Sequence, residues 1–200
     1  MTSPVRITSV ALSLLVLAVA AGVYLLFRNG GALQPAAGLP SGGDFTLRSY
    51  AGPVSLQDLR GKVVLVHFGY TNCPDVCPVS VAATSQALAA MTPAELERVV
   101  ALFISVDPER DTPERLREYT AYFHPNLVGL AGTSEETETV AKRYGAIYVK
   151  QPANPDGSYA VDHSVATYLV APTGRLQAIL PYGARAEDLL GAVRKLLASA

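Results

Sequence analysis

The stretch Thr71-Asn72-Cys73-Pro74-Asp75-Val76-Cys77-Pro78 holds both cysteines of the chain, four residues apart and each followed by proline. An apolar run typical of a buried β-strand, Val63 to Phe68, precedes it. An alanine-rich helical run, Val79 to Ala90, follows it. The two thiols are therefore expected where a buried strand turns into a helix. Backbone N–H groups and the helix dipole at such a place favour a thiolate over a thiol.

Two sulfurs at this spacing can do two things. They can close a redox-active disulfide, Cys73–Cys77, or together they can bind a soft metal ion such as Cu(I). His163, in the segment Val161-Asp162-His163-Ser164, could supply a third ligand. Two thiolates and one imidazole suit trigonal Cu(I) and also tolerate Cu(II), whereas a structural zinc usually takes four protein ligands.

Three separated motifs in one order carry a family resemblance. They are the TNCPDVCP stretch after an apolar strand, the segment Ser105-Val-Asp-Pro-Glu-Arg-Asp-Thr-Pro113, and Asp162-His163-Ser164. Together they resemble the Sco/SenC family, whose members are membrane-tethered, thioredoxin-fold copper chaperones for cytochrome oxidase assembly. The resemblance covers Phe45 to Leu197. One departure is Asn72, where many members carry histidine at a position that is not a ligand.

The resemblance implies a copper site made of Cys73, Cys77 and His163. It also implies that the chain delivers copper to a cytochrome oxidase subunit and receives it from another copper chaperone. Asp107 is then expected near the copper site. Asp75, between the cysteines, is expected to tune the thiolates or meet a partner, and Asp162 to orient the imidazole or balance its charge.

A thiol–disulfide oxidoreductase acting on cysteines of the oxidase, or of another exported protein, is the alternative. Thioredoxin-like oxidoreductases use two residues between the cysteines and usually a tryptophan before them, whereas this chain has three intervening residues and no tryptophan. Whether the protein is an enzyme therefore stays open, and a redox or copper sensor is a third interpretation. His67, in the central apolar run, is interpreted as a structural residue.

The N-terminal residues Ile7 to Phe27 contain no charge and as a helix would span about 31 Å, enough for the core of a bilayer. Residues 1–28 are therefore predicted to be a single-pass anchor, with the soluble domain on the periplasmic side of a cytoplasmic membrane. Ala18-Val19-Ala20 offers the alternative of a cleaved signal peptide, but the apolar run continues past it. Residues 29–43, uncharged and rich in Gly, Ala and Pro, predict a flexible linker.

Residues 44–200 are predicted to form one thioredoxin-like copper-binding domain. The formal net charge of the chain is −1, which gives no basic footprint for nucleic acid. Alternating strand and helix patterns that end in a hairpin and a helix predict an α/β sandwich. Gly52-Pro53 predicts an N-terminal β-hairpin. Turn residues between Gln151 and Asp162 predict a hairpin or ordered loop that delivers His163 to the cysteines.

The predicted elements end at specific sequence signals. Thr92-Pro93-Ala94-Glu95 is a capping-box pattern, and Asp111 or Thr112 is expected to cap the helix that begins at Pro113. The expected strands and helices are Phe45–Leu47, Val54–Leu56, Val63–Phe68, Val79–Ala90, Val99–Val106, Pro113–Phe123, Leu127–Leu130, 133–144, Ile147–Lys150, Val165–Val170, Leu176–Leu180 and Ala186–Leu197.

Overall fold

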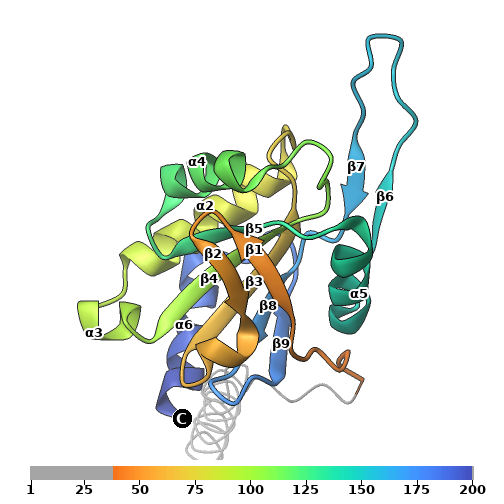
Figure 1. Cartoon of the computed structure of the whole chain (residues 1–200). Helices are drawn as coiled ribbons and strands as arrows, with labels where there is room; N and C mark the ends of the chain where they lie inside the picture. The colour runs from red at the N-terminus through yellow and green to blue at the C-terminus, as the bar shows by residue number, and fades with distance from the viewer. Residues whose placement is uncertain (1–37, 200) are drawn as a thin grey trace, which may run out of the picture. The chain divides into compact units, whose positions relative to one another are not determined.

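The structure of the chain is a computed structural model that describes residues 38–199 (Figure 1). The predicted anchor and most of the predicted linker lie outside these residues. None of the described helices is long and apolar enough to span a bilayer. The elements, in chain order, are β1 Thr46–Ser49, β2 Gly52–Ser55, the 3₁₀ helix η1 Leu56–Leu59, β3 Val63–Gly69, α2 Val76–Ala89, α3 Pro93–Leu96, β4 Val99–Ser105, α4 Pro113–Phe123, β5 Leu127–Leu130, α5 Ser134–Tyr144, β6 Tyr148–Lys150, β7 Val161–His163, β8 Thr167–Val170, β9 Leu176–Leu180 and α6 Ala186–Ala198.

A five-stranded mixed sheet forms the centre, in the order β5-β4-β3-β8-β9. β3 pairs in parallel with β4, and β4 with β5, while β8 runs antiparallel to both β3 and β9. All seven residues of β3 are buried, because this strand has a neighbour on each side and helices on both faces. This explains why β3 reads as a continuous apolar run in the sequence rather than as an alternating one.

Side chains at alternate positions of β3 and β4 point to opposite faces of the sheet, and so toward different helices. Phe103 of β4 contacts Tyr119 of α4, and the ring of its register partner His67 reaches Thr84 of α2. Phe68 points the other way, where its ring packs against Tyr144 of α5. Helices therefore cover both faces of the sheet, which confirms the predicted α/β sandwich. The N-terminal hairpin β1–β2 is also confirmed, and it joins the body through a bridge between Arg48 and Ala131.

The strands β6 and β7 form a separate two-stranded sheet. The loop between them extends away from the body of the domain, toward the top of Figure 1. We call residues 148–163 the β6–β7 arm. The arm is the hairpin predicted between Gln151 and Asp162, and His163 is its last residue.

Several boundaries differ from the sequence-based expectation, and three of these differences bear on the site or on the extent of the domain. Helix α2 begins at Val76 rather than Val79, because Pro78 falls in the first turn, where a helix needs no backbone N–H donor. The predicted strand Val165–Val170 begins only at Thr167. The folded domain also starts before Asp44, since the Gly42 N–H donates to the Arg143 carbonyl at 2.8 Å and the Tyr144 hydroxyl donates to the Gly43 carbonyl at 3.2 Å.

His67 is a buried histidine that the fold keeps neutral. Its Nε2 lies 2.9 Å from the Thr84 hydroxyl, and burial lowers the pKa of the imidazole to about 4. An unfolded chain, in which the pKa is about 6.5, binds the extra proton first, so the free energy of unfolding should fall as the pH falls from about 6.5 to 4.

This titration should remove on the order of 3 kcal/mol of stability. Urea unfolding at pH 7 and pH 4 checks it. His67→Gln keeps a side chain that can hydrogen-bond Thr84. Over the same pH interval its free energy of unfolding should fall by about 3 kcal/mol less than that of the wild-type chain. Equal losses in the two proteins would show that His67 does not titrate in this way.

Candidate metal centre

The two cysteines lie where β3 passes into α2, at the C-terminal edge of the parallel strands. Cys73 is in the turn, with its backbone N–H donating to the Tyr70 carbonyl at 3.2 Å. Cys77 is the second residue of α2. Both side chains are buried, at 9% and 4% exposure. Both sulfur atoms are therefore largely shielded from solvent where β3 passes into α2.

Gly69, the last residue of β3, leaves the space that the Cys77 sulfur fills. A Cβ at this position would come within 2.8 Å of both the Cys77 Sγ and the Phe103 ring. Its backbone has no positive φ, so the requirement for glycine is one of space and not of conformation. The strand end is thus shaped to accept a sulfur atom against its backbone.

His163 reaches the cysteines from the far part of the sequence, on the last residue of β7. Its Nε2 lies 3.1 Å from the Cys77 Sγ, and its Nδ1 lies 3.0 Å from the Ser164 carbonyl oxygen. Since a carbonyl can only accept, Nδ1 carries the proton, and Nε2 presents its lone pair to the sulfur. The Tyr70 ring meets the imidazole edge-on, with the ring centroids 5.8 Å apart.

The three predicted ligands come together in one group. One donor atom each from Cys73, Cys77 and His163 all lie within 4.8 Å of one another, and both thiols are free. Donors that share one first-row metal ion lie roughly 3–4 Å apart, so a small closure of this group would suffice. Two soft sulfurs and an imidazole with a free lone pair match the donor set that Cu(I) prefers.

The electrostatics of Cys77 differ from the expectation for a helix N-terminus. Burial is the main cause that raises the pKa of this thiol above its usual range, and the nearby Cys73 and Asp111 add to the rise. The Tyr70 backbone N–H works in the opposite direction without cancelling it. The prediction that helix entry favours a thiolate is therefore wrong for Cys77, because burial favours the protonated thiol.

The three acidic residues singled out in the sequence lie in different places. Asp75 is exposed at the N-cap position of α2, and its side chain makes no capping bond. Asp162 is exposed on the arm and accepts a 2.6 Å hydrogen bond from Gln151, while the imidazole proton of His163 goes to the Ser164 carbonyl. Asp107 is buried, at 3% exposure, in contact with the arm.

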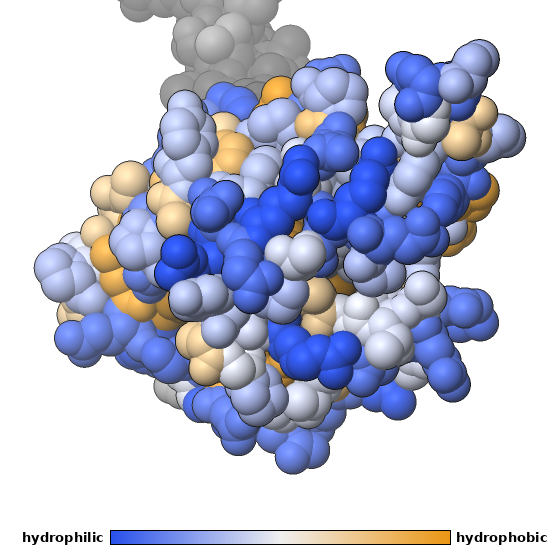
Figure 2. Space-filling model, turned by 45° about the horizontal axis from the view of Figure 1, so that its top comes forward, coloured by the Kyte–Doolittle hydropathy of each residue, from blue (hydrophilic) through white to orange (hydrophobic). Residues whose placement is uncertain are grey.

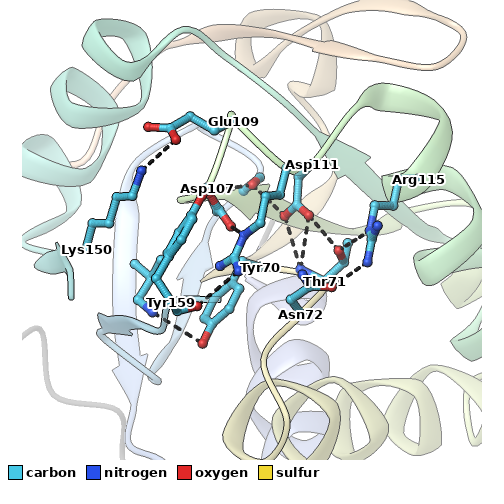
Figure 3. Close-up of polar contacts among 12 residues, drawn as sticks. Tyr70, Thr71, Asn72, Asp107, Glu109, Asp111, Arg115, Lys150 and Tyr159 are labelled. Atoms are coloured by element: carbon cyan, nitrogen blue, oxygen red, sulfur yellow. Dashed lines mark hydrogen bonds and ion pairs between the residues drawn. The ribbon is translucent and has the colours of Figure 1, made fainter. Parts of the chain in front are cut away.

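Asp111 is a supporting residue that the sequence interpretation missed. It is 1% exposed, and it accepts hydrogen bonds from the Thr71 N–H at 3.0 Å, the Thr71 hydroxyl at 2.6 Å and the Ser105 hydroxyl at 2.7 Å (Figure 3). Thr112, not Asp111, caps α4. Asp111 therefore fixes the loop that leads to Cys73 to the end of β4.

The surface over this edge of the sheet is polar. Strongly hydrophilic residues gather near the middle of the face seen in Figure 2. Arg115 contributes to the polar contacts here: its Nε donates to the Thr71 hydroxyl at 2.7 Å, and its Nη2 donates to the Oδ1 of Asn72 (Figure 3). His163 is only half-buried, so the group of ligands has one side near solvent.

A protein-family model described as SCO1/SenC matches residues 34–198. The chain belongs to the SCO1/SenC family. Among known relatives, the mitochondrial SCO2 homolog of Bos taurus is 38% identical over 159 residues, which cover 78% of this chain and 60% of the bovine protein. This Sco/SenC chain therefore spans less than two thirds of the length of that relative.

Two solved structures agree with the assignment. ScoI of Bradyrhizobium japonicum with copper bound is 39% identical, with a TM-score of 0.72, over 78% of this chain and 99% of the other. BsSco, a member of the Sco family of cytochrome c oxidase assembly proteins in which a disulfide switch was identified, is 29% identical, with a TM-score of 0.63, over 81% of this chain and 96% of the other. The fold is thus the thioredoxin-like Sco fold, as the sequence predicted.

Proposed function

We propose that this Sco/SenC chain binds one copper ion through Cys73, Cys77 and His163 and passes it to a subunit of a respiratory cytochrome oxidase. The observation that carries the proposal is the convergence of two sulfurs and one imidazole nitrogen within 4.8 Å. The copper-bound relative supports the choice of metal. Another copper chaperone is the proposed donor.

The geometry suits a site that transfers its copper ion to an acceptor protein. The three ligands lie near the surface, with the imidazole half-buried, so a thiolate or imidazole of the acceptor can attack from the open side before the donor ligands leave. The Nδ1–H bond to Ser164 orients the ring, and the buried sulfurs exclude water from the other side. Ligand exchange of this kind moves the metal without releasing it into solution.

Copper uptake should depend on the redox state of the cysteines. A two-electron oxidant that joins the sulfurs of Cys73 and Cys77 takes up the electrons, both thiol protons are lost, and the disulfide offers no thiolate to the metal. Anaerobic Cu(I) titration of the full-length chain should therefore give one copper per reduced chain and none per oxidised chain, with uptake restored by reduction. Equal uptake by both forms would contradict the proposal.

The alternative function, a thiol–disulfide oxidoreductase, has less support. A dithiol reductant needs a reactive thiolate, whereas burial raises the pKa of Cys77. It also has no need for an imidazole nitrogen directed at the sulfur, yet His163 Nε2 lies 3.1 Å from Cys77.

We also propose that residues 1–28 anchor the chain in a cytoplasmic membrane, with the copper-binding domain on the periplasmic side and residues 29–43 largely as a linker. The uncharged stretch Ile7–Phe27 supports this assignment. The chain should then stay with the membrane fraction through high-salt and alkaline washing and be released only by detergent. Recovery of a mature protein that begins near Ala21 would instead establish a cleaved signal peptide.

A further inference from the structure

The β6–β7 arm that carries His163 is held to the body of the domain mainly by side chains. Its two strands pair with each other and, among the described strands, with no strand of the central sheet. One backbone N–H of the arm, that of Val161, donates to the body of the domain, at the Tyr70 hydroxyl just past the end of β3, over 3.3 Å. The position of the imidazole therefore depends on contacts made by the loop that approaches β7.

Arg110, in the loop after β4, makes most of these contacts. Its guanidinium carbon lies 3.6 Å from the centre of the Tyr159 ring, and its Nη1 donates to the Tyr159 carbonyl at 3.0 Å. Its Nε bonds the buried carboxylate of Asp107, whose other oxygen accepts a 2.8 Å hydrogen bond from the Tyr159 hydroxyl. We call Asp107, Arg110 and Tyr159 the Arg110 cluster. Each of its three members contacts the other two.

The Arg110 cluster lies between the two halves of the metal centre. Tyr159 is four residues before His163 along the arm. On the other side, the guanidinium carbon of Arg110 is 5.5 Å from the centre of the Tyr70 ring, which itself packs edge-on against the His163 imidazole. Tyr70 also accepts the N–H of Cys73 on its carbonyl. The cluster thus touches the arm and the cysteine loop at once.

A second contact reinforces the same connection from the outer side. Lys150, the last residue of β6, forms a 2.6 Å ion pair with Glu109, and its Nζ lies 4.2 Å from the Tyr159 ring centre. Figure 3 shows these side chains side by side, with Tyr159 between Lys150 and the loop that carries Asp107. Both cations therefore pack against one tyrosine ring, which makes Tyr159 the common element of the attachment.

We propose that Tyr159 and Arg110 are positioning residues for copper binding: they hold the β6–β7 arm closed, so that His163 Nε2 stays within reach of the two sulfurs. This inference rests on the proposed function, but it concerns residues that bind no metal themselves. With the arm closed, His163 Nε2 lies 3.1 Å from the Cys77 Sγ, in place to act as the third ligand. Loosening the Arg110 cluster should lower the fraction of chains with a complete site and speed the loss of copper.

The test compares two tyrosine substitutions in the full-length chain. Tyr159→Ala removes the ring and the hydroxyl, so the buried Asp107 loses one hydrogen bond but keeps Arg110 as its ionic partner. The matched control is Tyr50→Ala, because Tyr50 packs in the same way under Arg117, 4.0 Å from its guanidinium carbon, away from the metal centre. Tyr159→Phe keeps the ring over Arg110 and should retain most of the Cu(I) affinity that Tyr159→Ala loses.

We expect Tyr159→Ala to weaken Cu(I) binding, measured against a competing chelator, by about 10- to 100-fold, the range typical of residues that support metal ligands. In the metal-free chain, hydrogen exchange at the Val161 amide should accelerate by at least about tenfold while exchange in β3 stays the same. Tyr50→Ala should change neither quantity.

Wild-type affinity together with wild-type Val161 exchange in Tyr159→Ala would overturn the proposal. So would an equal loss of affinity in Tyr50→Ala, or a failure of Tyr159→Phe to restore any affinity. If the wild-type chain itself took up no copper, the proposed function would fail instead. Val161 exchange, measured without metal, would still decide whether the cluster holds the arm.

Discussion

Replacing Cys77 with serine will abolish tight Cu(I) binding by the full-length chain, with a loss of affinity of more than about a hundredfold. The serine hydroxyl is a hard donor that keeps its proton near neutral pH, so it cannot stand in for a thiolate. The Cys77 sulfur is also the one that His163 Nε2 approaches, at 3.1 Å, so its loss removes the link between the two halves of the site. Cys73→Ser should have an effect of the same order.

Competition with a Cu(I) chelator measures this loss. Ala89→Ser adds a serine to the exposed C-terminal end of the same helix, α2, and should bind copper like the wild-type chain. If either cysteine variant kept the stoichiometry and affinity of the wild-type chain, the assignment of the metal centre would be wrong.

His163→Ala will separate copper binding from thiol chemistry. We expect Cu(I) affinity to fall by about 10- to 100-fold, because two thiolates without the imidazole leave the metal ion under-coordinated. The rate at which the reduced chain reduces a model disulfide should change by less than about twofold, since that rate depends on the thiolates.

His124→Ala is the matched control, because His124 ends α4 and its Nδ1 accepts a hydrogen bond from the Asn126 N–H at 3.0 Å, in a local turn of its own. It should alter neither copper affinity nor disulfide exchange. The opposite pattern in His163→Ala, with copper affinity intact and disulfide exchange slowed, would favour the oxidoreductase over the copper chaperone.

The sequence predicted the α/β sandwich and the three residues that the structure brings together as candidate ligands, because both depend on local patterns. The cysteine spacing, the apolar run of β3 and the turn residues of the arm each carry their signal within a short window. The same windows placed the start of α2 three residues late, since Pro78 was taken to precede the helix rather than to fall within its first turn.

Contacts between distant segments were the part that could not be predicted. Asp111 has the sequence context of a helix cap, and only the packing of β3 beside β4 brings it to the Thr71 backbone 40 residues away. Arg110 lies in the Ser105–Pro113 motif, which does not reveal its contacts, and Tyr159 lies in no motif. Their stacking exists because the arm folds back on the loop after β4. The raised pKa of Cys77 likewise follows from burial, which spacing alone does not reveal.

The candidate ligands of the metal centre come from two parts of the fold that share no strand, the turn and helix α2 that follow β3 and the strand β7 of the separate two-stranded sheet, and 86 residues separate Cys77 from His163. An unfolded or newly made chain therefore offers a copper ion the two sulfurs without the imidazole of His163 held beside them. The complete site is a product of folding, so copper binding and folding must be thermodynamically linked, and the metal should raise the melting temperature of the domain. A newly made chain could therefore be loaded at a complete site only after the arm has docked.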